Sequence, residues 1–139
     1  MKYIGLLLVS LFFISSCQQK EEGYLIMGSA AGFDEGTKVY VNAISQSNRP
    51  SIIDSTVIKN ESFSIALPPT PSSDFNYISF SNVPGNVIYL PENQKIEMTI
   101  YKDSLRSSKV LGGAENDLFF TYVNQLNNLA KKKEKASND

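Results

Sequence analysis

The sequence predicts a mainly β protein, either an antiparallel β-sandwich or a partial barrel of short strands, with one helix at the C-terminal end. Two observations predict this fold class. Between residues 24 and 111, apolar side chains recur at every second position in short segments that turn residues separate. Beyond Gly112-Gly113 the apolar spacing changes to that of a helix. We therefore expect a β domain over residues 24–115 and a helix within residues 116–139.

Each strand is predicted from period-two alternation or from a run of β-branched residues. In the clearest segment, Ile96, Met98 and Ile100 face one way and the polar residues between them face the other. In residues 37–44, the apolar side of the alternation consists of Val39, Val41 and Ala43. Strands are expected at residues 24–28, 37–44, 52–58, 62–67, 75–80, 87–90, 95–101 and 109–111.

Residues 52–58 and 62–67 are predicted to form the best hairpin of the chain, with a turn at Lys59-Asn60-Glu61. Asn60 tolerates the positive φ that a tight hairpin turn requires, whereas Glu61 suits that position less well than glycine. We therefore expect a loose turn. The proline-rich residues 68–73 predict an extended loop that crosses between sheet edges, because proline donates no backbone hydrogen bond. Pro84-Gly85 predicts another turn.

The C-terminal helix is predicted from one apolar stripe at helical spacing. Asn116 is expected to cap its first turn, where Glu115 and Asp117 place negative charge at the positive end of the helix dipole. Several lysines lie at the C-terminal end of this segment, where the negative end of the helix dipole favours cations. This role explains the lysines better than nucleic-acid binding does. Beyond Ala130 the stripe is lost, so a fraying tail is expected. The stripe comprises Leu118, Phe119, Tyr122, Val123, Leu126 and Leu129, and the lysines are Lys131, Lys132, Lys133 and Lys135.

Composition excludes several classes of function. The chain has 139 residues, a length that suits one domain. Its formal net charge is −1, so it lacks the basic excess of nucleic-acid-binding proteins. It contains no histidine, which is the most usual general base and metal ligand. Cys17 is the single cysteine, so no internal disulfide can form. We expect no metal site and no cofactor.

No catalytic residues are predicted, although three groups of side chains are candidates. Asp54-Ser55 lacks a base beside the serine, so a turn or strand hydrogen bond is the better interpretation. Glu92 and Glu97 could act as an acid and base pair, but nothing in their spacing favours this over solvated positions. Four aromatic residues could form a strip that contacts a sugar or peptide, although packing in the core or on the sheet is the default. These aromatic residues are Tyr77, Phe80, Tyr89 and Tyr101.

The N-terminus has the parts of a secretory signal: a basic Met1-Lys2, an apolar run over residues 4–14, and small residues before Cys17. The run is shorter than the ~20 residues that span a bilayer. Ile14-Ser15-Ser16-Cys17 resembles the lipobox of bacterial lipoproteins, with Ile14 and Ser16 where that pattern usually has Leu and Gly or Ala. The resemblance implies cleavage between Ser16 and Cys17 and acylation of Cys17 by lipid such as palmitate. An uncleaved anchor and a free mature thiol are the alternatives.

Residues 17–23 form a polar tether. Within it, Gln18, Gln19, Lys20, Glu21 and Glu22 resemble the lipoprotein export signal of Bacteroidetes, in which acidic residues follow a Gln/Lys start. That resemblance implies display on the cell surface. An ordinary solvated tether on an outer-membrane lipoprotein that faces the periplasm is the alternative.

Three segments together resemble the domain of unknown function 4369 family, the N-terminal domain of thioredoxin-like lipoproteins, mostly from Bacteroidetes. They are residues 24–41, which include Val39-Tyr40-Val41, residues 53–65, and residues 110–117, the glycine-containing step into the helix. In the second segment the family pattern is an Asp-Ser pair, an Asn-Gly type of turn and a Phe; here Asp54-Ser55 and Phe63 match and Glu61 replaces the glycine.

The resemblance implies a β-domain that, in many members, leads into a thioredoxin-like domain with a Cys-x-x-Cys pair. This sequence holds no such pair, so that redox activity cannot be carried by these residues. We therefore expect a non-catalytic, lipid-anchored binding or spacer module at the outer membrane, with a membrane and a protein as its partners. The alternative is an accessory domain of a thiol–disulfide oxidoreductase whose catalytic domain is absent from this sequence.

Overall fold

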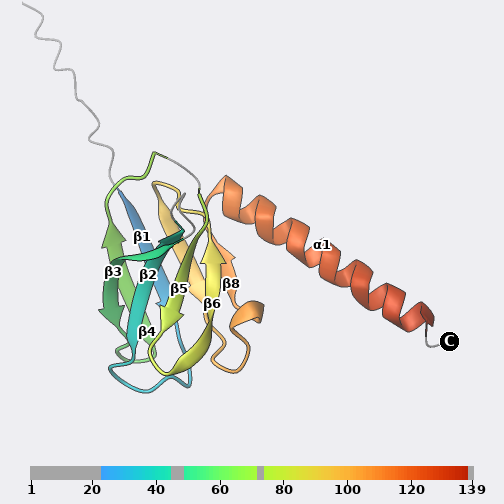
Figure 1. Ribbon diagram of the computed structural model, residues 1–139, viewed down its shortest axis with the longest axis horizontal. Coiled ribbons are helices and arrows are strands. Elements are labelled where there is room, and N and C mark those ends of the chain that lie inside the picture. Colours follow the sequence, from blue (N-terminus) through green and yellow to red (C-terminus); the bar gives the residue numbers. More distant parts are fainter. Residues whose placement is uncertain (1–22, 45–48, 72–73, 138–139) are drawn as a thin grey trace, which may run out of the picture.

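A computed structural model describes residues 23–44, 49–71 and 74–137 of the chain. These residues form a two-layer β-sandwich from which one long helix projects (Figure 1). The mainly β fold with a single C-terminal helix is therefore confirmed, and the two sheets remain open rather than closing into a barrel. The elements are β1 (Tyr24–Ser29), β2 (Lys38–Ile44), β3 (Pro50–Val57), β4 (Ser62–Leu67), β5 (Asn76–Phe80), β6 (Val83–Tyr89), β7 (Lys95–Thr99), the 3-10 turn η1 (Leu105–Ser107), β8 (Lys109–Leu111) and α1 (Ala114–Ser137).

Each layer of the sandwich is a sheet of four strands. One sheet has the order β4-β1-β7-β8 and the other β3-β2-β5-β6. All neighbours are antiparallel except β1 and β7, which run parallel with Ile26 opposite Ile96. A parallel pair cannot be joined by a tight hairpin. The chain accordingly builds all four strands of the second sheet, and β4 of the first, between these two central strands.

The core lies between the sheets and is lined by the inward side of the period-two patterns. Ile26, Ile78 and Ile96 are fully buried, and the inward residues of β4 and β7 are buried as predicted. The rings of Phe33 and Phe80 pack with their centroids 4.8 Å apart. Alternation therefore predicted which side of most strands faces the core.

The predicted hairpin between residues 52–58 and 62–67 is wrong. β3 pairs with β2 and β4 pairs with β1, so the two strands belong to different sheets. Only the bridge between Lys59 and Ser62 joins them. The turn itself is tight rather than loose: Asn60 and Glu61 both have positive φ, 49° and 54°. These are the two central positions at which a type I′ turn requires positive φ.

Contacts from a neighbouring loop hold this unusual turn. The carboxylate of Glu61 accepts a hydrogen bond from the backbone N–H of Gly32 at 3.3 Å. The backbone N–H of Asn60 donates to Glu35 at 3.0 Å, and the N–H of Ala30 donates to the Glu61 carbonyl at 2.8 Å. Tertiary contacts therefore compensate for the absence of glycine at position 61.

Two further local predictions differ from the structure. Pro84-Gly85 lies inside β6, and the turn before that strand contains Asn82 with φ 62°. β6 is an edge strand, where a residue without an N–H is tolerated. In β2 the pairing with β3 shifts register between Val41 and Asn42, and Asn42 becomes buried against the predicted alternation. Its amide donates to the Ser79 hydroxyl at 3.0 Å.

Candidate interaction surfaces on the helix and the outer sheet face

The start of α1 is fixed to the sandwich by a buried asparagine. Asn116 is fully buried, and its side chain exchanges two hydrogen bonds with the backbone of Leu90, accepting from the N–H at 2.9 Å and donating to the carbonyl at 2.7 Å. The same amide donates to the Gly112 carbonyl at 3.1 Å. Asn116 thus satisfies backbone groups just beyond the end of β6. It lies inside the helix, so its predicted role as the N-cap is wrong.

Glu92 is the residue that caps the helix. One of its carboxylate oxygens accepts hydrogen bonds from the backbone N–H groups of Glu115 at 3.0 Å and Asn116 at 3.1 Å. These N–H groups belong to the first turn, which has no partners within the helix, and the positive end of the helix dipole favours a carboxylate there. Sequence reasoning missed this role because the contact joins residues 23 and 24 positions apart.

The double glycine is required where the chain enters the helix. Gly113 has φ 94°, and a Cβ on it would lie 2.0 Å from the Glu92 carboxylate. Gly112 has φ 107°, and its Cβ would lie 2.3 Å from the Lys95 carbonyl. A side chain at position 112 would collide with the backbone of β7, one at position 113 would displace the Glu92 carboxylate, and both would be strained at these positive φ angles.

Beyond this junction, only one side of α1 contacts the sandwich. Phe119, Phe120 and Val123 are half-buried. The rings of Phe119 and Phe75 meet edge to face with centroids 5.3 Å apart. Together with Leu105 and residues of β6, the three helix residues surround a hollow of about 330 Å³ beside η1.

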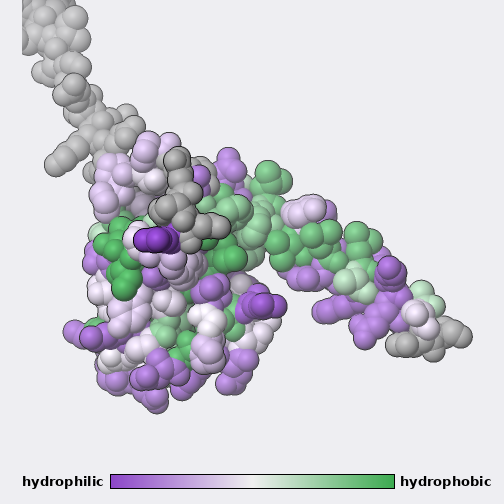
Figure 2. All heavy atoms as spheres, viewed as in Figure 1, coloured by the Kyte–Doolittle hydropathy of each residue, from purple (hydrophilic) through white to green (hydrophobic). Residues whose placement is uncertain are grey.

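The other apolar side of α1 is uncovered among the residues that the structure describes. Leu118, Tyr122, Leu126 and Leu129 retain 69%, 58%, 46% and 62% of their surface exposed. At about 100° per residue these four side chains fall within an arc of roughly 80°, so they form one continuous strip. Figure 2 shows apolar residues along one side of the projecting helix and hydrophilic residues along the other side and toward its far end. We call these four residues the outer stripe.

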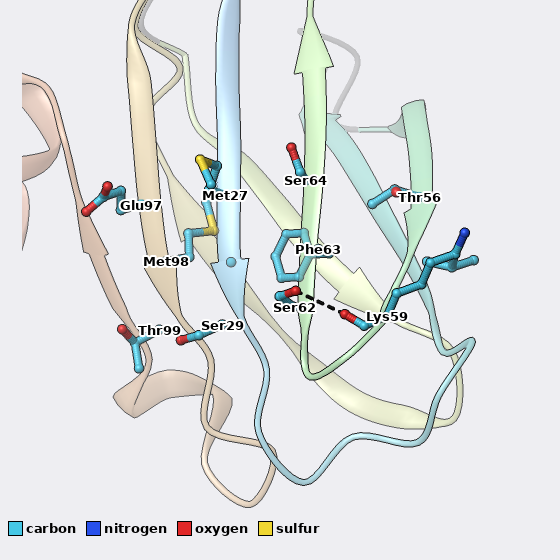
Figure 3. Close-up of a pocket in the computed structure, with 12 residues that line it drawn as sticks. Met27, Ser29, Thr56, Lys59, Ser62, Phe63, Ser64, Glu97, Met98 and Thr99 are labelled. Atoms are coloured by element: carbon cyan, nitrogen blue, oxygen red, sulfur yellow. Dashed lines mark hydrogen bonds between the residues drawn. The ribbon is translucent and has the colours of Figure 1, made fainter.

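A second accessible surface is a shallow groove of about 620 Å³ over the outer face of the β4-β1-β7-β8 sheet and the neighbouring edge of β3 (Figure 3). Met27 lies near its middle and is 42% exposed. Glu97 forms an ion pair with Lys95, which directs that carboxylate along β7. Several hydroxyl groups line the groove, and that of Ser62 donates to the Lys59 carbonyl at 3.0 Å. The groove therefore presents hydroxyl and charged groups around the exposed thioether of Met27.

The candidate catalytic groups lie apart and have structural partners. Asp54 accepts a hydrogen bond from the Ser55 backbone N–H at 2.7 Å on an exposed strand. Glu92 caps α1, whereas Glu97 lies over the outer sheet face, so the two carboxylates do not form an acid and base pair. Within residues 23–44, 49–71 and 74–137, no group of three or more Asp, Glu, His or Cys side chains could hold a metal ion.

The four aromatic residues considered for a binding strip are not gathered on one surface. Phe80 and Tyr89 are buried in the core, Tyr77 is half-buried and Tyr101 is exposed. The Tyr89 hydroxyl lies 3.3 Å from that of Tyr24. Burial raises the pKa of the Tyr89 phenol, and the hydrogen bond with Tyr24 raises it further. Tyr89 is thus a neutral core residue, which is the default interpretation of these aromatics.

A family model for a domain of unknown function, DUF4369, matches residues 24–119, well over half of the chain. The chain belongs to the DUF4369 family. This confirms the resemblance drawn from the three sequence segments. No curated protein and no solved structure matches the chain. The matched region of this DUF4369 domain comprises the sandwich and the first turns of α1, so most of the outer stripe lies beyond it.

The residues predicted to direct the chain to a membrane lie outside the described residues. They are Ser16, Cys17, Gln18, Gln19, Lys20, Glu21 and Glu22. In the described part of the chain, no helix is both long and apolar enough to cross a bilayer.

Proposed function

We propose that this DUF4369 chain is a non-catalytic binding or spacer module, anchored at the outer membrane by lipid on Cys17 and facing either the periplasm or the cell surface. The observation that carries the binding role is the outer stripe of α1. Four large apolar side chains lie uncovered on a helix that projects from the sandwich. Single exposed apolar residues are common on protein surfaces, whereas a contiguous exposed apolar strip marks an interaction surface.

The position of the first strand suits a short tether. β1 starts at Tyr24, seven residues after Cys17. A fully extended segment of this length reaches at most about 25 Å. Leu25 pairs with Lys95, and the Lys95 carbonyl borders Gly112 at the helix entrance. β1 and α1 therefore start at the same end of the sandwich, and a lipid on Cys17 would hold that end close to the bilayer.

Acylation would make this attachment lasting. Each buried methylene contributes about 0.8 kcal/mol, and a single acyl chain binds only marginally. The two or three chains of a bacterial lipoprotein exceed that threshold.

Mass spectrometry of the protein recovered from cell membranes tests the anchor. We expect an N-terminal Cys17 that carries acyl chains, and we expect Cys17→Ala to move the protein from the membrane fraction to the soluble fraction. An unmodified Cys17 thiol or an intact Met1 in the processed protein would refute the anchor.

Protease treatment of intact cells tests the side of the membrane. Digestion of the domain in intact cells supports surface display. Resistance in intact cells, followed by digestion once the outer membrane is opened, supports a domain that faces the periplasm.

Hydrogen exchange with and without cell-envelope extract tests the binding role. We expect slower exchange in α1 from Leu118 to Leu129 when the binding partner is present, at a total protein concentration that is held constant. Leu126→Glu should abolish this slowing, and Asn128→Glu, which adds the same charge on the opposite side of the helix, should preserve it. Equal exchange in α1 under all extracts and at all protein concentrations would refute a binding role for the stripe.

The alternative function is that of an accessory domain of a thioredoxin-like enzyme. The gene sequence downstream of the Asp139 codon distinguishes it from the proposed function. A reading frame that continues past Asp139 into a domain with a Cys-x-x-Cys pair would favour the accessory function. A stop codon followed by unrelated genes would exclude the fused form of it.

A further inference from the structure

We infer that the outer stripe of α1 binds the same stripe of a second copy of this chain, with the two helices antiparallel. This inference rests on the proposed binding role of the stripe, but it does not depend on lipidation. It is carried by the order of apolar and charged residues along the exposed side of the helix.

Three residues of the outer stripe, together with the half-buried Phe119 beside them, have the spacing of a helix-pairing seam. Phe119, Tyr122, Leu126 and Leu129 are separated by three, four and three residues. This is the alternation of three and four that lets two helices interlock their side chains. Leu118 widens the seam on one side, and the half-buried Phe119 borders it on the side of the sandwich.

Opposite charges continue the same line at both ends of the seam. Glu115 precedes Phe119 by four residues, and Lys133 follows Leu129 by four. Both residues are exposed. At about 100° per residue, both fall within the arc that the outer stripe occupies. The strip therefore runs from a negative end through apolar side chains to a positive end.

This order makes the strip complementary to itself only in the antiparallel direction. With Tyr122 placed opposite Leu126 of a second copy, Phe119 faces Leu129 and Glu115 faces Lys133, and each contact occurs twice because the pair has twofold symmetry. A parallel pair would instead place Glu115 beside Glu115 and Lys133 beside Lys133, which is unfavourable.

The shape of the molecule permits this arrangement. α1 has 24 residues and projects from the sandwich, so two antiparallel helices would place their sandwiches at opposite ends of the pair (Figure 1). A membrane surface is a less suitable occupant of the stripe. Lys133 would be attracted to anionic lipid, but Glu115 on the same line would be repelled.

Zero-length crosslinking between carboxylates and amines tests the pairing directly. In one helix, Glu115 and Lys133 lie about 27 Å apart at 1.5 Å per residue, so a direct crosslink between them must join two chains. Equal amounts of the full chain with ¹⁴N and with ¹⁵N are mixed in mild detergent, crosslinked and digested. We expect a Glu115–Lys133 crosslink that contains both isotopes.

Variants separate the stripe from other causes of association. Leu126→Glu should reduce the mixed-isotope crosslink at least tenfold, whereas the matched Asn128→Glu on the opposite side of the helix should leave it unchanged. Glu115→Lys and Lys133→Glu should each abolish self-pairing, and a mixture of the two variants should restore a pair, now between unlike chains, detected by light scattering.

Three results would overturn the inference. One is the absence of the Glu115–Lys133 crosslink at concentrations up to the millimolar range. A second is a pair that Leu126→Glu does not weaken. In that case association would come from another part of the chain, such as the apolar residues 4–14. A third is a parallel pair, which would give mixed-isotope crosslinks between Glu134 and Lys133 instead. If envelope extract still slows exchange in α1 when self-pairing fails, the binding role stands and its occupant is another molecule.

Discussion

The inward faces of the sandwich and the outer stripe of α1 contain the same kinds of side chain in opposite environments. Tyr89 is 0% exposed and Tyr122 is 58% exposed; Leu67 is 5% exposed and Leu118 is 69% exposed. Burial of a large apolar side chain contributes roughly 1.5–3 kcal/mol to folding. The inward residues therefore stabilise the domain, whereas the outer stripe contributes little to its folding and is available to a partner.

The junction between these regions explains why they can differ. Asn116 and Glu92 hold the first turn of α1 against the sandwich by hydrogen bonds at 2.7–3.4 Å. A fixed first turn sets the direction of the rest of the helix without covering it. The projecting part can then present its apolar side at a constant orientation, which a flexible segment could not do.

Truncation of matched leucines gives the largest expected difference between the two regions. Leu67→Ala should lower the free energy of unfolding by about 2–5 kcal/mol, because it leaves a cavity between the sheets. Leu118→Ala should change it by no more than about 0.5 kcal/mol, because Leu118 is exposed. Denaturant titration at protein concentrations below the onset of self-pairing measures both. Equal destabilisation would show that the stripe is part of the folding core.

Asn116→Ala should have the next largest effect. It should lower the free energy of unfolding by roughly 1–3 kcal/mol, because it leaves the backbone groups of Leu90 buried and without partners. The readout is again the free energy of unfolding, supplemented by exchange of the Leu90 amide hydrogen, which should become faster. Asn128→Ala, on the exposed part of the same helix, serves as the control and should leave the exchange of the Leu90 amide unchanged. A stable Asn116→Ala variant with a protected Leu90 amide would contradict the proposed junction.

The strand faces could be predicted from sequence because alternation directly records which side is buried. This holds for Ile65 and Ile96, whose neighbours in sequence are exposed. Strand pairing could not be predicted in the same way. β3 and β4 are joined by a tight turn but enter different sheets, and alternation says nothing about which strand lies beside which.

The interaction surfaces were predicted less completely than the fold. The helical spacing predicted an apolar stripe, but spacing alone cannot say whether a sandwich or solvent lies against it. In the structure, two of the six residues of the predicted stripe, Phe119 and Val123, lie on the side of α1 that contacts the sandwich. The other four form the outer stripe. The capping role of Glu92 depends on a contact between distant parts of the chain, for which one sequence contains no local signal.

The buried Tyr89 makes the stability of the sandwich depend on pH. Burial raises the folded-state pKa of Tyr89 above its unfolded value of about 10, so its neutral form is favoured in the folded state. The raised pKa adds to the free energy of unfolding, and this contribution is fully present below about pH 10. It is lost as the pH rises above 10, at up to about 1.4 kcal/mol per pH unit. Tyr89→Phe should remove this part of the slope between pH 10 and 11, measured as the free energy of unfolding at each pH. Identical slopes in the wild type and in Tyr89→Phe would contradict the prediction.

The smallest expected effect concerns the charge at the junction. Glu92→Gln retains an oxygen that can accept hydrogen bonds from the N–H groups of Glu115 and Asn116, but it removes the negative charge from the positive end of the helix. Such a charge contributes about 0.3–1 kcal/mol, so exchange of these two amide hydrogens should become roughly two- to fivefold faster. Glu97→Gln, on the outer sheet face, changes the net charge equally and should not affect them. If both variants accelerate exchange alike, net charge rather than the position of Glu92 governs the junction, and hydrogen bonding alone fixes the direction of the helix.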